Sequence, residues 1–288
     1  MMFIIGVVTV FGCVLLGYLM HHGKLSVLWQ PNEFIIILGA AIGSFILGNP
    51  KDLIIDTLKS FKKLMRGKPH TKENFLELLL FIYNICKVMK TKGMLEVEQA
   101  IEKPSESELF TKYPTVLAHH EALEFFCDYI RLITMGMDNH FALEELMEKD
   151  IETIEHHGAM ASGALSTVGD AMPALGIVAA VLGVIITMGS ITEPPEILGG
   201  LIGAALVGTF FGVLMSYGII APMAGFIGKF CEAEVAYFRV IKAGLLAHTQ
   251  GNAPVITVEF ARKIIAPHER PTFHELDAAI NGPQPAAE

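Results

Sequence analysis

The sequence has few charged residues and almost no tryptophan. Of its 288 residues, 18% are charged and one is tryptophan, whereas 52% are hydrophobic, and the mean hydropathy is +0.50. Soluble domains carry about 25% charged residues, so this composition argues against a wholly water-soluble protein. Acidic residues outnumber basic ones by 30 to 21. The resulting net charge of -9 would repel a phosphate backbone and argues against nucleic acid as a partner.

Cysteine is also scarce, and its spacing offers no site. The four cysteines stand singly, at Cys13, Cys86, Cys127 and Cys231. Without a CxxC pair or regular spacing they do not indicate zinc or a disulfide framework, and we interpret them as reduced packing residues. The sequence also lacks a GxxxxGK(S/T) loop, a GxSxG elbow and a pair of catalytic carboxylates, so we expect no enzyme.

The histidines include three adjacent pairs, at residues 21–22, 119–120 and 156–157. Neighbouring rings on a helix point to different faces, which prevents them from holding one metal ion together. We therefore expect solvated surface histidines, no metal site and no cofactor.

Long uncharged stretches are the main feature of the sequence. Four stretches without Asp, Glu, Lys, Arg or His could cross a bilayer: residues 1–20, 34–50, 171–192 and 197–228. The first has no basic residue before its apolar run and no small-x-small cleavage pattern after it, so we interpret it as a span and not as a signal peptide. The expected fold class is an all-α integral membrane protein with four transmembrane helices.

The distribution of basic residues predicts the orientation, because Lys and Arg are retained on the cytoplasmic side during insertion. Residues 51–170 hold 14 Lys and Arg and residues 229–288 hold six, whereas the loop 21–33 holds only Lys24 and the loop 193–196 holds none. We therefore expect both termini in the cytoplasm and two short loops outside.

The polar segments show helical patterns. In residues 51–170 apolar side chains recur at three- and four-residue steps, which predicts a large helical cytoplasmic domain between the second and third spans. The pattern from Phe141 to Ile154 continues towards the third span and predicts one long helix. The tail 229–288 begins as a helix, and its Pro- and Ala-rich end after Gly282 is expected to be disordered.

Small residues at four-residue steps line the third and fourth spans. They are Gly176, Ala180, Ala204, Gly208, Gly212 and Ser216. Such faces permit close backbone approach, either within the hairpin or against another protein, and both alternatives stay open.

None of the four stretches contains a carboxylate or histidine, and Asp170 stands at the edge of the third. A proton carrier normally needs such a group, so a partner would have to supply it. Thr209 and Tyr217 could line a wet path, although a hydroxyl bonded back one helical turn is the simpler interpretation of Thr209. Pro173 fits the first turn of a helix and Pro222 a kink, or the pair marks a hinge.

Several motifs carry a family resemblance: GDAMPALGIVAAVLG at 169–183, LVGTFFG at 206–212, YGIIAP at 217–222 and ERP at 269–271. They resemble the MotA family of flagellar motor stator proteins, and the match runs over nearly the whole chain. The resemblance implies a bacterial inner-membrane ring, thought to be pentameric, around a MotB-like dimer that provides the aspartate. Proton flow would then step the ring and turn a FliG-like rotor protein.

The resemblance also implies roles for single residues. The ion path would pass Thr209, Ala180 and Tyr217, and sodium-driven relatives have a threonine in place of Ala180. Alanine offers no oxygen to sodium, so protons are the expected coupling ion. The residues expected to couple ion flow to movement are Pro173, Pro222 and Asp170.

Lys90 and Glu98 are the residues that the resemblance places at the rotor. Lys90 departs from an arginine of well-known relatives, keeping the charge and losing the fork geometry. Lys90 and Glu98 are eight residues apart, which is a little over two helical turns. Both side chains could therefore point to the same side of one helix if Gly93 does not break it.

Two other functions compete with the stator. A proton-channel subunit of the ExbB or TolQ type would energise outer-membrane processes through the same ring-around-helices principle. A membrane scaffold would use the small-residue faces only for assembly. Four spans in this arrangement favour the stator.

Overall fold

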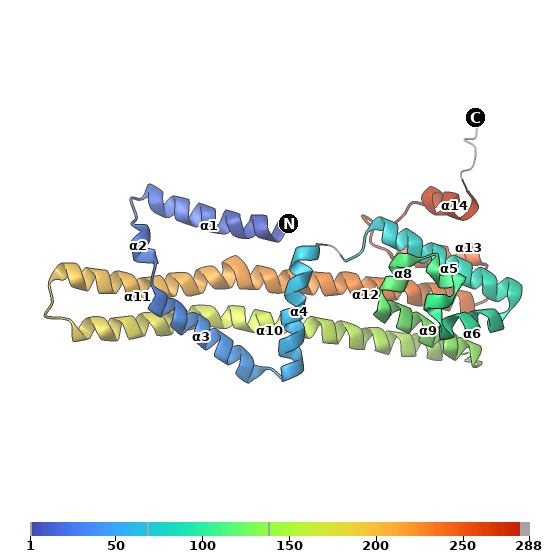
Figure 1. Ribbon diagram of the computed structural model, residues 1–288, viewed down its shortest axis with the longest axis horizontal. Helices are drawn as coiled ribbons and strands as arrows, with labels where there is room; N and C mark the ends of the chain where they lie inside the picture. The colour runs from blue at the N-terminus through green and yellow to red at the C-terminus, as the bar shows by residue number, and fades with distance from the viewer. Residues whose placement is uncertain (1, 68, 138, 283–288) are drawn as a thin grey trace, which may run out of the picture. The chain divides into compact units, whose positions relative to one another are not determined.

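A computed structural model describes residues 2–67, 69–137 and 139–282, without the side chains of 63–66. Over these ranges the regular elements are all helical, which confirms the expected class (Figure 1). Four helical segments are long and apolar enough to cross a membrane: Met2–Met20, Leu25–Gly48, His140–Gly189 and Pro195–Thr249. The end for which disorder was expected, residues 283–288, lies outside the described residues.

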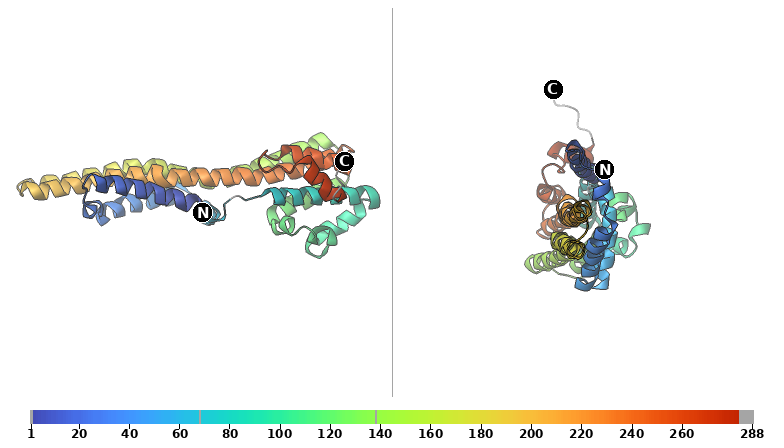
Figure 2. Two further views of the ribbon diagram at one scale, coloured as in Figure 1. Left: turned by 90° about the horizontal axis from the view of Figure 1, so that it is seen from above. Right: turned by 90° about the vertical axis from the view of Figure 1, so that its left-hand side faces the viewer.

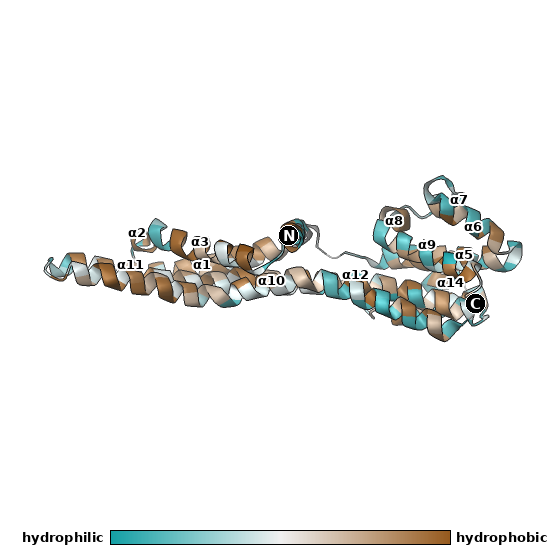
Figure 3. Ribbon diagram, turned by 90° about the horizontal axis from the view of Figure 1, so that it is seen from below, coloured by the Kyte–Doolittle hydropathy of each residue, from teal (hydrophilic) through white to brown (hydrophobic). Residues whose placement is uncertain are grey.

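The chain divides into two compact units. The first unit combines Met1–Gly67 with His157–Cys231, and the second combines Lys68–His156 with Glu232–Glu288. Two helices, α10 (His140–Gly189) and α12 (Ala221–Thr249), contribute to both. Hydrophobic residues prevail along α11 (Pro195–Met215) and α3 (Pro31–Gly48) of the first unit (Figure 3). The first unit is built from α1 (Met2–Met20), α2 (Leu25–Leu28), α3 (Pro31–Gly48), α4 (Lys51–Arg66), most of α10 (His140–Gly189), α11 (Pro195–Met215), the π-helical η2 (Ser216–Ile220) and the start of α12 (Ala221–Thr249).

The long helix expected from the apolar pattern after Phe141 is confirmed. α10 runs without interruption for 50 residues, from His140 to Gly189. Pro173 lies inside this helix, so its interpretation as a first-turn proline is wrong. A proline inside a helix removes one backbone hydrogen bond, which the surrounding packing must offset.

Close contact of α10 with α11 is the central feature of the first unit (Figures 1 and 2). A Cβ placed on Gly176 would lie 2.9 Å from the Gly208 carbonyl oxygen and 3.3 Å from the Gly212 Cα. A Cβ on Gly212 would lie 2.6 Å from the carbonyl oxygen of Met172. Gly176 and Gly212 are therefore used inside the hairpin, where only glycine lets the backbones come this close.

α3 packs onto this hairpin and completes the core of the first unit. Its buried Ile37 and Ala41 cluster with Met172 and Ala179 of α10. The helix begins at Pro31, whose fixed φ suits a first-turn position. The start of the helix therefore lies three residues before the second span expected from residue 34.

The second unit is a set of shorter amphipathic helices. A core of aromatic rings joins α5 (Lys72–Lys92), which carries Phe81, to α7 (Glu108–Thr111) with Phe110 and α9 (His120–Thr134) with Phe126. α10 and α12 are linked here by an ion pair of Arg239 with Glu155 at 2.7 Å. The remaining elements are α5 (Lys72–Lys92), α6 (Met94–Glu102), η1 (Pro104–Glu106), α7 (Glu108–Thr111), α8 (Pro114–Ala118), α9 (His120–Thr134), α13 (Pro254–Ile264) and α14 (Phe273–Asn281).

We predict that Gly212→Ala destabilises the protein and that Gly200→Ala, on the same helix, does not. Alanine favours a helix over glycine by about 1 kcal/mol, and a Cβ on Gly200 meets nothing within 4 Å. The Cβ on Gly212 meets backbone, so overpacking should cost about 1–3 kcal/mol. The thermal unfolding midpoint in detergent measures both, and equal shifts would contradict the close contact.

Candidate functional site

The α10–α11 contact brings two of the residues predicted to line the ion path, Thr209 and Ala180, to the same level along the hairpin. We call the side chains at one such level a layer. The Thr209 hydroxyl donates to the carbonyl oxygen of Gly176 across the hairpin, at 3.4 Å. Its interpretation as a hydroxyl bonded back along its own helix is therefore wrong. Ala180 lies in the same layer, because a Cβ on Gly208 would be 3.5 Å from the Ala180 nitrogen.

Glu33 is a buried carboxylate at this layer that the sequence analysis did not find. Its side chain projects from the first turn of α3, and a Cβ on Gly208 would lie 3.0 Å from its Oε2 atom. The residue is 8% exposed, and Oε2 has no hydrogen-bond partner among the described residues. A buried carboxylate without a partner is costly and is therefore a candidate functional group.

A second layer of the hairpin contains an internal proline in α10 and a π-helical turn after α11. Pro173 lies within α10, and the π-helical turn η2 begins at Ser216, whose buried hydroxyl finds no partner in the part of the chain that the structure describes. Pro173 lies at the level of the last turn of α11, just before η2, since a Cβ on Gly212 would be 2.6 Å from the Met172 carbonyl oxygen. π-Helical turns occur often at functional sites.

The other sequence-predicted residues of the spans lie near this second layer. Asp170 and Pro222 are exposed, and Tyr217 is 67% exposed. A Cβ on Gly169 would lie 3.2 Å from Ile220, which sets the α10 segment before Asp170 beside the start of α12. Asp170 and Pro222 are therefore at a similar level of the hairpin, while Tyr217 points outward.

The two residues expected at the rotor are both exposed in the second unit but belong to different helices. Gly93, at φ +91°, ends α5 and begins α6, so it does break the helix. The Lys90 ammonium donates to the Gly251 carbonyl oxygen at 3.1 Å. Glu98 lies on the exposed face of α6. Lys90 and Glu98 therefore do not lie on one continuous helix, as the expectation that they face the same way required.

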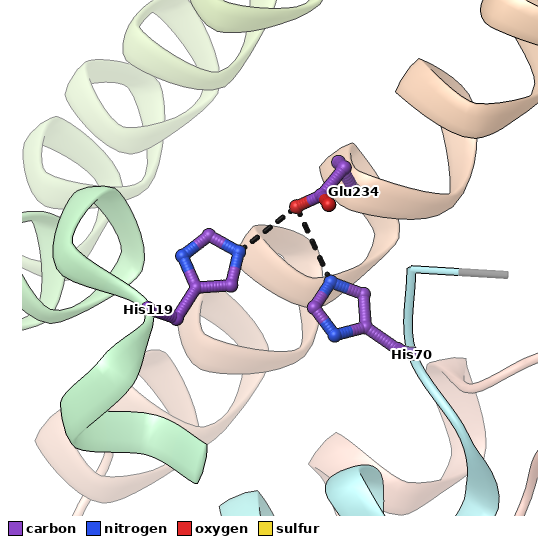
Figure 4. A group of neighbouring side chains, drawn as sticks. All are labelled: His70, His119 and Glu234. Carbon is purple, nitrogen blue, oxygen red and sulfur yellow. Dashed lines mark hydrogen bonds and ion pairs between the residues drawn. The ribbon is translucent and has the colours of Figure 1, made fainter. Parts of the chain in front are cut away.

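A cluster of His70, His119 and Glu234 lies inside the second unit (Figure 4). The His119 Nε2 is 2.9 Å and the His70 Nε2 3.3 Å from the same oxygen, Oε2 of Glu234. Both imidazoles stack against Tyr237, with centroid distances of 5.3 Å and 4.3 Å. The expectation that His119 is a solvated surface residue is wrong, since its side chain is 19% exposed.

The electrostatics of the cluster favour an ionised Glu234. Burial opposes ionisation, but hydrogen bonds from His119 and His70 outweigh it and lower the pKa of this carboxyl to about 2. Burial likewise disfavours the protonated form of His119. Its hydrogen bond with Glu234 and the negative charges of Glu234 and Glu121 together outweigh this and raise the pKa of the imidazole above its usual value.

Comparison with known proteins places this arrangement in a family. The family description "Motility protein A N-terminal" matches residues 4–93, and "MotA/TolQ/ExbB proton channel family" matches residues 119–240. Motility protein A of Escherichia coli (strain K12) is 42% identical over 99% of this chain and 97% of its own. Motility protein A of Salmonella typhimurium (strain LT2) is 42% identical over 97% and 95%.

Solved structures support the same fold. "Structure of C. jejuni MotAB" contains a chain with a TM-score of 0.76 and 18% identity, covering 92% of this chain and 95% of that one. The flagellar MotAB stator complex from Bacillus subtilis gives a TM-score of 0.69 at 23% identity, covering 89% and 92%. At these identities the likeness shows the fold alone.

Four long apolar helices and these matches define a multi-pass membrane protein of the MotA/TolQ/ExbB proton channel class. Within that class, the chain belongs to the motility protein A (MotA) family of flagellar motor stator proteins. This family consists of channel proteins and not of enzymes, so the chain is not an enzyme.

Proposed function

We propose that this chain works with a MotB-like partner in a proton-conducting stator complex that turns the flagellar rotor. The observation that carries the proposal is the 42% identity to a motility protein A over 99% of the chain. The solved complexes that share the fold are MotAB assemblies, which supports a MotB-like partner here. A subunit of the ExbB or TolQ type would belong to the same channel class. The match over the full length of this chain, however, is to motility proteins.

In this proposal the chain lies in the bacterial inner membrane with both termini in the cytoplasm. Twenty of its 21 Lys and Arg lie in residues 51–170 and 229–288, which the insertion rule assigns to the cytoplasm. Several copies, in our proposal five, form a ring around the partner's helices. α1 supports such an assembly because none of its residues is buried within the chain, leaving its apolar side chains for lipid or for neighbouring copies.

The proposed ion path follows the layer formed by Thr209 and Ala180, with Tyr217 near its inner end. Protons are its coupling ion, because Ala180 has no side-chain oxygen for a sodium ion. Proton arrival and release on the partner's aspartate would act on the layer of Pro173, Pro222 and Asp170. A helix with an internal proline and a π-helical turn bend there at lower cost than regular helices.

Deleting the gene from its host should abolish swimming while leaving the flagella intact, and a plasmid copy should restore swimming in sodium-free medium. The first result follows from the stator function and the second from proton coupling. Swimming speed and flagellar staining are the measurements. Intact swimming with lost energised uptake across the outer membrane would instead support the ExbB or TolQ alternative, and speed that returns only with added sodium would contradict proton coupling.

Glu33 extends the proposed path with a carboxylate from this chain. It lies beside Gly208, the residue before Thr209, and is buried without a hydrogen-bond partner in the described ranges. Carboxylates inside membrane proteins commonly serve in proton relays. We propose that Glu33 passes protons to the partner's aspartate from the outer side.

Glu33→Gln should lower the motor's rotation speed severalfold at low load and leave the stall torque unchanged. Speed at low load depends on how fast protons are transferred, whereas stall torque depends on the free energy released per proton. Bead assays over a range of loads separate the two quantities.

The exposed Glu196, in the first turn of α11, provides the matched control. Glu196→Gln should rotate at the normal speed, and Glu33→Asp should retain part of it. If Glu33→Gln keeps its full speed at low load, or loses torque in the same proportion, Glu33 is not a relay.

Charge reversal at Lys90 or Glu98 should impair rotation without reducing the amount of protein in the membrane. An exposed charge contributes little to folding, so the loss would arise from the rotor contact. A compensating reversal on the charged surface of a FliG-like rotor protein should restore part of the motion. Swimming speed and membrane abundance are measured together for each variant.

The control is Lys103→Glu, because Lys103 is an exposed lysine of the same unit. Lys90→Met separates loss of the bond to Gly251 from reversal of charge. Normal swimming of both reversals would remove these residues from the rotor contact, and so would a loss confined to membrane abundance.

A further inference from the structure

We propose that His70, His119 and Glu234 form a binding site for a divalent transition metal of the zinc type. This site is separate from the proposed ion path and does not depend on the stator function. The three residues come from distant parts of the chain: the segment before α5, the residue before α9, and α12 (Figure 4). Their metal-ligating atoms all lie within 4.8 Å of one another.

The spacing of the ligand atoms fits a tetrahedral ion. Zinc binds imidazole nitrogen and carboxylate oxygen at about 2.0–2.2 Å, which separates neighbouring tetrahedral ligands by about 3.3 Å. The His70 and His119 Nε2 atoms are 3.3 Å and 2.9 Å from the Glu234 oxygen. Small side-chain movements therefore suffice to admit the ion, and two imidazoles with one carboxylate are a known zinc ligand set that leaves the fourth position for water.

The surroundings hold the ligands in place and carry negative charge. His70 is 8% exposed at its side chain, and Tyr237 stacks against both imidazoles. These ring contacts restrict rotation, which lowers the entropy lost on binding an ion. Glu121 and Glu77 add negative charge near His119 and Tyr237. The local field is thus suited to a divalent cation.

Binding would change one backbone interaction. The Nδ1 atom of His119 accepts from the Ala122 amide at 3.3 Å, so the proton of the neutral ring is on Nε2. When Nε2 binds a metal ion, the proton moves to Nδ1 and this hydrogen bond is lost. The loss is one long hydrogen bond, while three metal–ligand bonds form and tie three segments of the second unit together.

Titration of the full-length protein, purified in detergent and treated with a chelator, tests the site directly. Cobalt(II) should give the intense visible absorption of a four-coordinate ion at one equivalent per chain, and zinc should displace it. The same titrations give the affinity for each metal. Thermal unfolding should shift upward with zinc, because a ligand that binds the folded state stabilises it.

Glu234→Gln is the most informative variant, because the amide keeps the shape and can still accept from both histidines. It should weaken cobalt and zinc binding at least ~10-fold and remove the thermal shift. His156→Gln, in an exposed histidine of the same unit, should bind as the wild type does. If Glu234→Gln does not fold, the wild-type cobalt spectrum decides alone.

The proposal is overturned if the wild-type protein gives no four-coordinate cobalt spectrum. It is equally overturned if Glu234→Gln binds metal as tightly as the wild type, or if His156→Gln removes the binding. In each case the cluster is a hydrogen-bonded core group and holds no metal. Motility is measured in none of these experiments, so failure here leaves the stator proposal untouched, and the reverse also holds.

Discussion

The contact between the glycine backbones of α10 and α11 is the constraint on which the first unit depends. Gly176 and Gly212 have no side chain between the helices, so the two backbones approach to a separation that a Cβ at either position would prevent. This approach sets the level of Thr209 relative to the Gly176 carbonyl and creates the surface that α3 covers. The buried position of Glu33 follows from the same contact, because its carboxylate occupies space next to Gly208.

Much of this architecture could be predicted from the sequence, because apolar length and small-residue spacing are local properties. The uncharged stretches indicated four spanning helices, and the pattern after Phe141 indicated the single long α10. The small residues indicated that the third and fourth spans pack closely, but not whether they pack against each other or against another protein. Sequence spacing cannot decide between packing within a hairpin and packing against another protein, since both use the same van der Waals contact.

The buried polar groups could not be found in the same way. Glu33 was assigned to a loop because it precedes the uncharged stretch, although Pro31 at the first turn was a local signal that the helix begins earlier. The cluster of His70, His119 and Glu234 has no local signal, because its members lie far apart in the sequence. The positive φ of Gly93 is a backbone property that a helical apolar pattern does not reveal, and it separates Lys90 from Glu98.

The internal proline of α10 and the π-helical turn η2 have a mechanical consequence. Gly176 follows Pro173 by three residues, and Gly212 precedes Ser216 by four, so the tightly packed stretch lies within about one helical turn of the internal proline and of the π-helical turn. The hairpin is therefore stiff along the glycine contact and compliant directly beside it. We expect a bending force on the hairpin to act at this boundary, because an internal proline and a π-helical turn are where helices bend, while the close glycine contact keeps the spacing of the two backbones.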